Sequence, residues 1–407
     1  MSERRFVGAL AGIVGVGLLL RALYAYALVK SKPLLGDALE FHLQANLLAD
    51  GKGYIQPFLW QSQHIAAASA DKPPLYPLLQ AALSLFGGRS YQWHHLVGIV
   101  SGTATVAIVG LLGRQVAGAR AGLIAAALAA VYPLLVAADG SLRSESTEAF
   151  LVACTLLAAL RLRAAPSMGR AAVVGVLVAV ATLTRGEALL LLPLVALPAA
   201  GWRTRNAGIA VLACALVMAP WLIRCWVVFD QPVAISTNTG GLVAGANCDS
   251  TYHGSLLGQW DYGCVPPPVH RNEAQEADRL RGIGLRYARD HAGRLPVVLA
   301  ARLGRSFELF HPRRQAREEA FFEGRNLKVE EAGVAMYYVL VALAAYGVVV
   351  LRRRRGPWLL LLAPLASVAF VSVTAYGFTR FRVMAEPGLV VLAAVGVDAV
   401  IGRRRRA

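Results

Sequence analysis

Residues 4–37 read RRFVGALAGIVGVGLLLRALYAYALVKSKPLLGD, and this stretch decides the fold class. The apolar run at 6–29 is longer than the ~20 residues that cross a bilayer as a helix. Arg4 and Arg5 precede it and place its start in the cytoplasm, since cytoplasmic flanks carry the excess of basic residues. A signal peptide is the alternative, but the run is long for one, and we interpret it as a retained first transmembrane helix.

Nine further apolar segments follow the first. We expect them at 93–112, 121–138, 147–160, 171–184, 188–200, 207–228, 333–351, 358–375 and 383–401. Together they predict an all-α polytopic membrane protein with about ten transmembrane helices. The two segments flanking Arg185 and Glu187 could instead form one long buried helix. We favour two spans because a single one would break the alternation of the loops.

The composition agrees with repeated membrane crossing. The chain is 57% hydrophobic and only 16% charged, whereas a soluble domain carries about 25% charged residues. The net charge of +17 raises the question of nucleic acid. The basic residues fall mainly between apolar runs, however, and the chain has no nucleic-acid-binding motif. We therefore expect no nucleic-acid partner and attribute the charge to membrane topology.

The basic residues orient the chain. Those expected in the cytoplasm are Arg4, Arg5, Arg114, Arg120, Arg161, Arg163, Arg170, Arg203, Arg205, Arg352 to Arg355 and Arg403 to Arg406. Of the 24 carboxylates, only Glu3 and Asp398 lie in or beside these segments. The other carboxylates gather on the opposite side. The sequence thus predicts a multi-pass protein of the cell membrane with both termini cytoplasmic and its active site extracytoplasmic.

Two expected outer regions are long, at 30–91 and 230–332, and loops of such length usually carry function. We divide the chain into a catalytic transmembrane module at 1–229, an extracytoplasmic region at 230–332 and C-terminal helices at 333–407. Cys248 and Cys264 in the second region predict a disulfide, because that compartment is oxidising. A metal site is the alternative, but the spacing of nearby ligands fits no strong zinc pattern. We expect this region to select the acceptor.

The first outer region carries the clearest chemistry. Asp37 opens an amphipathic helical segment directly after the first span, and the run DKPP follows at 71–74. A carboxylate at the membrane boundary can accept a proton from a hydroxyl nucleophile. Lys72 can neutralise a phosphate as a point charge. The structural alternatives are a helix N-cap for Asp37 and a solvated turn for the DKPP run.

This loop resembles that of the GT-C glycosyltransferases that use lipid-linked sugars, the group of the protein O-mannosyltransferases and aminoarabinose transferases. The resemblance is carried in order by Asp37, Gly51, Asp71-Lys72-Pro73-Pro74 and Phe86-Gly87, and it returns at Arg380-Phe381-Arg382 and Pro387. It implies that Asp37 is the catalytic base and that Asp71 and Lys72 lie close to the donor phosphate. Protein mannosyltransferases carry a second acidic residue after the catalytic Asp. Ala38 stands there in this chain, which argues against a protein mannosyltransferase proper.

Charged residues at the outer ends of the spans complete the predicted site. Arg185 is a candidate ligand of the donor phosphate, or else an ion-pair partner of Glu187, since charges amid apolar sequence face a cavity or a partner. Arg382 is a second candidate phosphate ligand in the cluster with Tyr376 and Arg380, the alternative being interfacial anchoring. Supporting or acceptor-binding roles are expected for Asp71, Arg143, Glu145, His64 and Tyr76.

These residues predict an integral-membrane glycosyltransferase. The donor would be a polyprenyl-phosphate-linked sugar, and the acceptor an envelope glycan, lipid or protein. Asp37 would deprotonate the acceptor hydroxyl, and direct displacement would invert the anomeric centre. The scheme requires no metal and no cofactor. The alternative is a transporter or flippase of a lipid-linked saccharide, which would predict internal repeats and charges near the midplane of the membrane.

Overall fold

A computed structural model describes residues 1–202, 204–269 and 272–404. In this part of the chain every regular element is a helix, and the single β-bridge joins Ile55 to Ala68. The predicted all-α fold is therefore confirmed. Arg203, Arg405 and Arg406, three of the residues used for orientation, lie outside the described residues.

Each of the ten predicted spans falls on helical structure, but the helices differ in length. Five are long and apolar enough to cross a membrane: Glu3–Val29 (α1 and its π-helical end), Tyr91–Ala117 (α5), Arg205–Phe229 (α11), Leu327–Arg353 (α17) and Thr379–Gly402. The last of these begins with a 3₁₀ segment (Thr379–Ala385) and continues into α19 (Glu386–Arg404). A sixth forms if α6 (Ala119–Val131) and α7 (Pro133–Asp139), bent by 59°, count as one span. The chain is a multi-pass membrane protein, and the count of about ten crossings stays a prediction.

The bend and the shorter helices have local causes. Pro133 starts α7 directly after α6, and a proline inside a helical run removes a backbone hydrogen bond and kinks the run. The helix α8 (Glu145–Ala164) carries four charged residues near its ends. The helix α9 (Met168–Thr182) ends before a 3₁₀ turn that starts at Gly186. The segment around Arg185 is thus a break between two helical segments, as the two-span interpretation expects.

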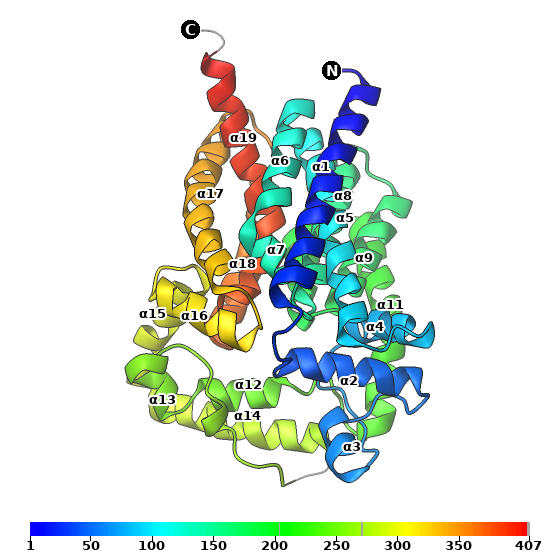
Figure 1. Cartoon of the computed structure of the whole chain (residues 1–407), viewed down its shortest axis with the longest axis vertical. Coiled ribbons are helices and arrows are strands. Elements are labelled where there is room, and N and C mark those ends of the chain that lie inside the picture. The colour runs from blue at the N-terminus through cyan, green and yellow to red at the C-terminus, as the bar shows by residue number, and fades with distance from the viewer. Residues whose placement is uncertain (203, 270–271, 405–407) are drawn as a thin grey trace.

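The helices outside the bundle form a separate layer. Both termini lie at one end of the bundle, and the helices of the two long outer regions gather at the other (Figure 1). The first region contributes α2 (Asp37–Ala49), α3 (Pro57–Gln63) and α4 (Leu75–Leu85). The second contributes α12 (Thr239–Ala246), α13 (Asp249–Tyr252), α14 (Glu273–Asp290), α15 (Leu295–Ser306) and α16 (Pro312–Phe322). The helix α18 (Trp358–Thr374) returns the chain towards this layer before the last span.

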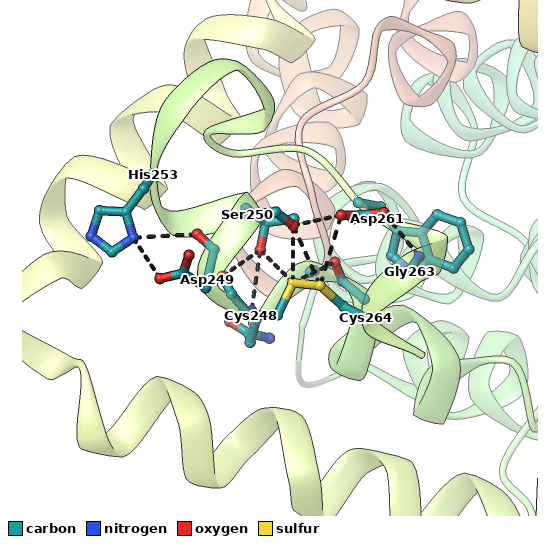
Figure 2. Close-up of a disulfide and its surroundings, with 12 residues drawn as sticks. Cys248, Asp249, Ser250, His253, Asp261, Gly263 and Cys264 are labelled. Atoms are coloured by element: carbon teal, nitrogen blue, oxygen red, sulfur yellow. Dashed lines mark hydrogen bonds and ion pairs between the residues drawn. A yellow bond between two sulfur atoms is a disulfide. The ribbon is translucent and has the colours of Figure 1, made fainter. Parts of the chain in front are cut away.

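The predicted disulfide between Cys248 and Cys264 is present, and it joins the start of α13 to a short 3₁₀ turn (Figure 2). The Cα atoms of the two cysteines are 6.2 Å apart. Beside the bridge, the Ser250 hydroxyl donates a hydrogen bond of 2.6 Å to a carboxylate oxygen of Asp261. The covalent link fixes a loop that has little regular structure of its own, and loop closure is the usual way in which a disulfide stabilises a fold.

A buried ion pair joins the first span to the bent pair α6 and α7. The Arg21 Nε atom lies 2.7 Å from a carboxylate oxygen of Asp139, and both side chains are almost fully buried. The other two guanidinium nitrogens donate to backbone carbonyls of Gly17, Ala129 and Ala130 at 3.1–3.3 Å. Because each of the three guanidinium nitrogens has an acceptor, the pair is held in one geometry.

The Arg21–Asp139 pair generates a stability prediction. Arg21→Leu leaves the Asp139 charge buried without a partner and should lower the free energy of unfolding by about 3–5 kcal/mol. Thermal unfolding of the protein in detergent, followed by size-exclusion chromatography, measures the change. Arg5→Leu, at an exposed position of the same helix, is the control. The double variant Arg21→Leu/Asp139→Leu should regain most of the loss, and a loss as large as that of the single variant would contradict the pairing.

Candidate functional site

A cavity of about 650 Å³ lies between the bundle and the layer of outer helices. Its wall draws on α2, the DKPP run, the turn after α9, the loop before α12, α14, α18 and the 3₁₀ segment that precedes α19. The charged residues of the wall are Asp37, Asp71, Lys72, Arg185, Glu187, Asp278, Arg281 and Arg380. Residues from both long outer regions and from the last pair of helices therefore meet in one space.

Asp37 lies at the centre of the charged part of this cavity. It is the first residue of α2, and the residue before it, Gly36, takes the N-cap position. One carboxylate oxygen is 3.2 Å from the Lys72 ammonium, and the other is 2.9 Å from Arg143 and 2.8 Å from Arg380. The N-cap alternative for Asp37 is therefore wrong. With 26% of its side chain exposed, the carboxylate remains open to the cavity.

The three cations set the protonation of Asp37. Burial alone raises the pKa of the carboxyl, but Lys72, Arg380 and Arg143 outweigh that effect and hold the pKa well below its usual range. The carboxylate is thus ionised at neutral pH. Its affinity for a proton stays low as long as the cations remain in contact with it.

Lys72 is surrounded by carboxylates. Its ammonium nitrogen is 2.6 Å from Asp71, 3.2 Å from Asp37 and 3.3 Å from Glu40. Burial lowers the pKa of Lys72, but the three carboxylates raise it well above its usual range, so the side chain keeps its charge. Glu40 was not among the predicted site residues. Its spacing of three from Asp37 puts both side chains on one helix face, which is the sequence signal that could have found it.

The DKPP run is held in place from the second outer region. The Glu273 carboxylate accepts hydrogen bonds from the backbone N–H of Ala70 at 2.7 Å and from the Thr237 hydroxyl at 2.9 Å. The backbone N–H of Thr237 donates to the Ala70 carbonyl at 2.9 Å. From α11, Arg224 donates to the Ser69 carbonyl at 2.5 Å. The segment that carries Lys72 is therefore no solvated turn, and its backbone is fixed by polar contacts.

Arg185 forms a second charged centre in the same wall. Its guanidinium lies 2.8 Å from Glu145, 2.7 Å from Glu187 and 3.3 Å from Glu148. The ion pair with Glu187 that was the alternative interpretation exists, yet Arg185 still faces the cavity. Glu145 is almost fully buried behind Arg185 and Arg380 and is absent from the cavity wall.

The two arginines near the last span take different places. Arg382 is 1% exposed, pairs with Glu386 at 2.7 Å and lies 3.5 Å from the ring centre of Tyr337. It does not line the cavity, and its predicted role as a phosphate ligand there finds no support in this position. Arg380 lines the cavity instead, where it contacts Asp37 and the Tyr376 hydroxyl, 2.9 Å away.

Of the three predicted residues that remain, Arg143 contacts Asp37, whereas Tyr76 and His64 lie outside the cavity wall. Arg143 lies behind Asp37, contacts Glu323 and donates to the Phe322 carbonyl at 3.0 Å. Tyr76 is fully buried and packs against Phe41, with ring centres 4.9 Å apart. His64 is exposed at the end of α3, away from the cavity wall. Neither Tyr76 nor His64 lines the cavity.

One side of the cavity is apolar. Phe370, Val371 and Ala375 at the end of α18 line it together with Ile235 and Leu242 from the second outer region. Phe370 is 55% exposed. A ligand with a hydrocarbon chain could therefore lie along α18 while its polar head meets Lys72 and Arg380. Among the described residues, no group of three or more His, Cys, Asp or Glu side chains could hold a metal ion.

The resemblance to the GT-C membrane glycosyltransferases that the first outer loop indicated is confirmed, by a family model that matches part of the chain and by solved structures of the same fold. Residues 71–224 match the family model described as dolichyl-phosphate-mannose-protein mannosyltransferase. A search of the curated proteins gives no match to the chain.

Two solved structures from one archaeon show the same fold, and a third structure matches with a lower TM-score. The apo oligosaccharyltransferase of Archaeoglobus fulgidus aligns with 99% of this chain and 51% of its own, at a TM-score of 0.61 and 16% identity. The enzyme AglB of that organism, in complex with an inhibitory peptide and a dolichol-phosphate, aligns at 0.55 and 16% identity over 98% of this chain and 50% of its own. ArnT from Cupriavidus metallidurans aligns at 0.46 and 15% identity over 97% and 78%. The chain spans about half the length of the oligosaccharyltransferases.

Glu273 gives the outer layer a dependence on pH. Burial raises the pKa of its carboxyl, Asp71 raises it further, and hydrogen bonds from Ala70, Ser69 and Thr237 offset part of the rise, so that the pKa is about 7. The ordinary value is 4.5, so the folded chain holds this proton more tightly than the unfolded chain does. The resulting stabilisation is fully present below about pH 4.5 and is lost as the pH rises through about 7.

We therefore predict that Glu273→Gln flattens the pH dependence of thermal stability. The wild-type melting temperature should fall between about pH 5 and about pH 8, and the variant should lose a clear part of that fall because its amide does not titrate. Asp278→Asn, at an exposed position of the same helix, is the matched control. Curves of equal slope for wild type and Glu273→Gln would show that this carboxyl does not titrate in the range.

Proposed function

We propose that this protein is an inverting glycosyltransferase that moves a sugar from a polyprenyl-phosphate donor to a hydroxyl acceptor on the extracytoplasmic face of the cell membrane. The observation that carries the proposal is the Asp37 carboxylate, which faces the cavity within 3.2 Å of Lys72 and 2.8 Å of Arg380. A base beside two cations fits a reaction in which a hydroxyl loses a proton while an anionic phosphate departs. Both termini would lie in the cytoplasm, opposite the site.

The donor would occupy the part of the cavity between Lys72, Arg185, Arg380 and α18. The three cations supply charge for the phosphate, and arginine also offers paired N–H donors that match phosphate oxygens. The apolar residues at the end of α18 border the same space and suit the first isoprene units. The donor could thus enter sideways from the bilayer while its head group stays in the aqueous cavity.

The chemical step would use the residues already in contact. Asp37 accepts the proton of the acceptor hydroxyl, whose oxygen forms a bond to the anomeric carbon on the face opposite the phosphate. The bond between that carbon and the phosphate oxygen breaks, and its electron pair leaves with the polyprenyl phosphate. Lys72, Arg185 and Arg380 balance the charge of the departing phosphate, and their effect is largest where water is excluded.

The acceptor would approach from the opposite wall. Asn238, Thr239, Asp278 and Arg281 line this side, and Arg281 is held by Asp278 at 2.7 Å and by the Thr239 hydroxyl at 3.1 Å. These groups offer hydrogen-bond donors and acceptors suited to a hydroxyl-rich envelope glycan, a glycolipid or a polar peptide. A flippase is not favoured, because the charged cavity lies at one end of the bundle, away from the termini.

The central prediction concerns the base. Asp37→Asn should lower sugar transfer by at least about 100-fold, because general-base catalysis contributes about 10²–10⁴ to a rate. Transfer of a radiolabelled sugar from a polyprenyl-phosphate donor in membranes measures the effect. The control is Asp50→Asn at the far end of the same helix, where the carboxylate pairs only with the half-exposed Arg89 in the described part of the chain.

Two further measurements separate loss of chemistry from loss of structure. Asp37→Asn removes the charge that faces Lys72, Arg143 and Arg380, so its melting temperature in detergent should fall, but the protein that still elutes as a single species on size-exclusion chromatography should retain the polyprenyl-phosphate donor on washing. Transfer at the wild-type rate by a folded Asp37→Asn protein would rule out this carboxylate as the base. Donor binding without any turnover by the wild-type protein would rule out the enzyme function.

A further inference from the structure

A second cavity, of about 310 Å³, is formed by helix ends on the side of the bundle away from the proposed active site. These ends of α17 and α19 lie at the end of the bundle that carries both termini (Figure 1). The cavity is lined by α17 and α19 with one residue from the start of α6. Its charged lining residues are Arg120, Arg353, Arg354 and Asp398. Nothing in the proposed transfer reaction uses this cavity.

The cavity follows from how α17 and α19 cross. A Cβ atom on Gly347 would lie 1.9 Å from the Leu392 carbonyl oxygen, and one on Gly396 would lie 2.3 Å from that of Leu343. The two backbones are therefore in direct contact at this level, which only small residues permit. The cavity is lined by the next turns of both helices, so it opens directly beyond the crossing.

The charges of the cavity are mainly positive. Arg120 donates to the backbone carbonyl of Asp398 at 3.2 Å and also contacts its carboxylate, so these two charges balance each other. The side chains of Arg353 and Arg354 form no ion pair with any residue that the structure describes, and both are exposed. Two arginines are thus left to bind an anion.

The position and the floor of the cavity indicate what kind of anion fits. The apolar part of α17 ends at Leu351, directly before Arg352, so the arginines lie where a membrane span meets water. Val349, Val350 and Ala399 are aliphatic lining residues, and the two valines precede Arg353 and Arg354 by one turn of α17, on the side of the membrane interior, so we call these three residues the apolar floor. A basic rim above an apolar floor at the level of the lipid head groups matches a phospholipid, with its phosphate between the arginines and its glycerol and upper acyl chain below.

We propose that this cavity binds an anionic phospholipid. Arg353 and Arg354 would bind its head group, and the turns of α17 and α19 beyond the crossing would surround the lipid. Such a lipid would fill the space between the two helices and tie the last span to α17. The proposal is independent of the catalytic role proposed for the protein, because the two sites lie at opposite ends of the bundle.

The test is a lipid-retention measurement on the full chain. The protein is reconstituted in an equimolar mixture of phosphatidylglycerol and phosphatidylcholine, extracted in mild detergent and washed, and the retained lipids are quantified by mass spectrometry. Wild type should retain phosphatidylglycerol over phosphatidylcholine by about tenfold or more, since each arginine adds a favourable contact to an anionic head group. The variant Arg353→Gln/Arg354→Gln should retain the two lipids in nearly equal amounts.

The chain offers a matched control. Arg352→Gln/Arg355→Gln removes the same charge from the same segment, but neither residue lines the cavity. It should keep the wild-type preference. An equal loss of phosphatidylglycerol retention in both double variants would show that the basic segment acts only as a general membrane-facing charge. The site would also be overturned if the wild-type protein retained the two lipids equally. Arg353→Lys/Arg354→Lys, which keeps the charge, should retain most of the preference and shows that the effect does not arise from misfolding.

Inorganic phosphate distinguishes a lipid from a free anion. Millimolar inorganic phosphate, added during washing, should leave the retained phosphatidylglycerol unchanged, because free phosphate makes no use of the apolar floor. If phosphate displaces the lipid, the cavity is a site for a free phosphate anion and the lipid assignment is wrong.

Discussion

The constraint on which the structure depends is the negative charge of Asp37 in a largely enclosed space. A carboxylate in such a place is costly unless cations and hydrogen bonds compensate it. Lys72, Arg143 and Arg380 provide that compensation from three parts of the chain that are far apart in sequence. The contacts join the first outer region, the turn before α8 and the approach to the last span. The interactions that form the site therefore also help to hold the outer layer on the bundle.

The same compensation sets a condition on catalysis under the proposed function. With three cations in contact, Asp37 is a weak base, and a hydroxyl would not readily give it a proton. A donor phosphate competes for Lys72 and Arg380, and each contact that moves from the carboxylate to the phosphate raises the proton affinity of Asp37. The base would thus gain strength only after the donor is bound. Such an order would couple the strength of the base to the presence of the donor.

The sequence predicts the parts of this structure that depend on composition and local order. The apolar runs and the disulfide between Cys248 and Cys264 follow from such patterns, whereas the placing of Asp37 and Lys72 in one site followed from the resemblance of the first outer loop to a known family. No such pattern decides whether Arg380 or Arg382 faces the cavity, because both residues lie in one 3₁₀ segment. With about three residues per turn, side chains two positions apart point in different directions, and only tertiary contacts decide which one meets the cavity. The burial of Tyr76 is also decided by a tertiary contact, because its packing on Phe41 sets which face of α4 is covered.

The extent of the family match bears on which part of the chain decides specificity. The match covers residues 71–224, which include Lys72 and Arg185 but none of the cavity wall between 231 and 281. That wall is joined to the DKPP run through Glu273 and Thr237, so it closes the site without belonging to the matched segment. Positions that handle a phosphate are constrained by one chemistry, whereas a wall that meets the acceptor must fit one particular partner. Under the proposed function, donor handling therefore belongs to the shared segment together with Asp37 and Arg380, and acceptor choice belongs to the wall at 231–281.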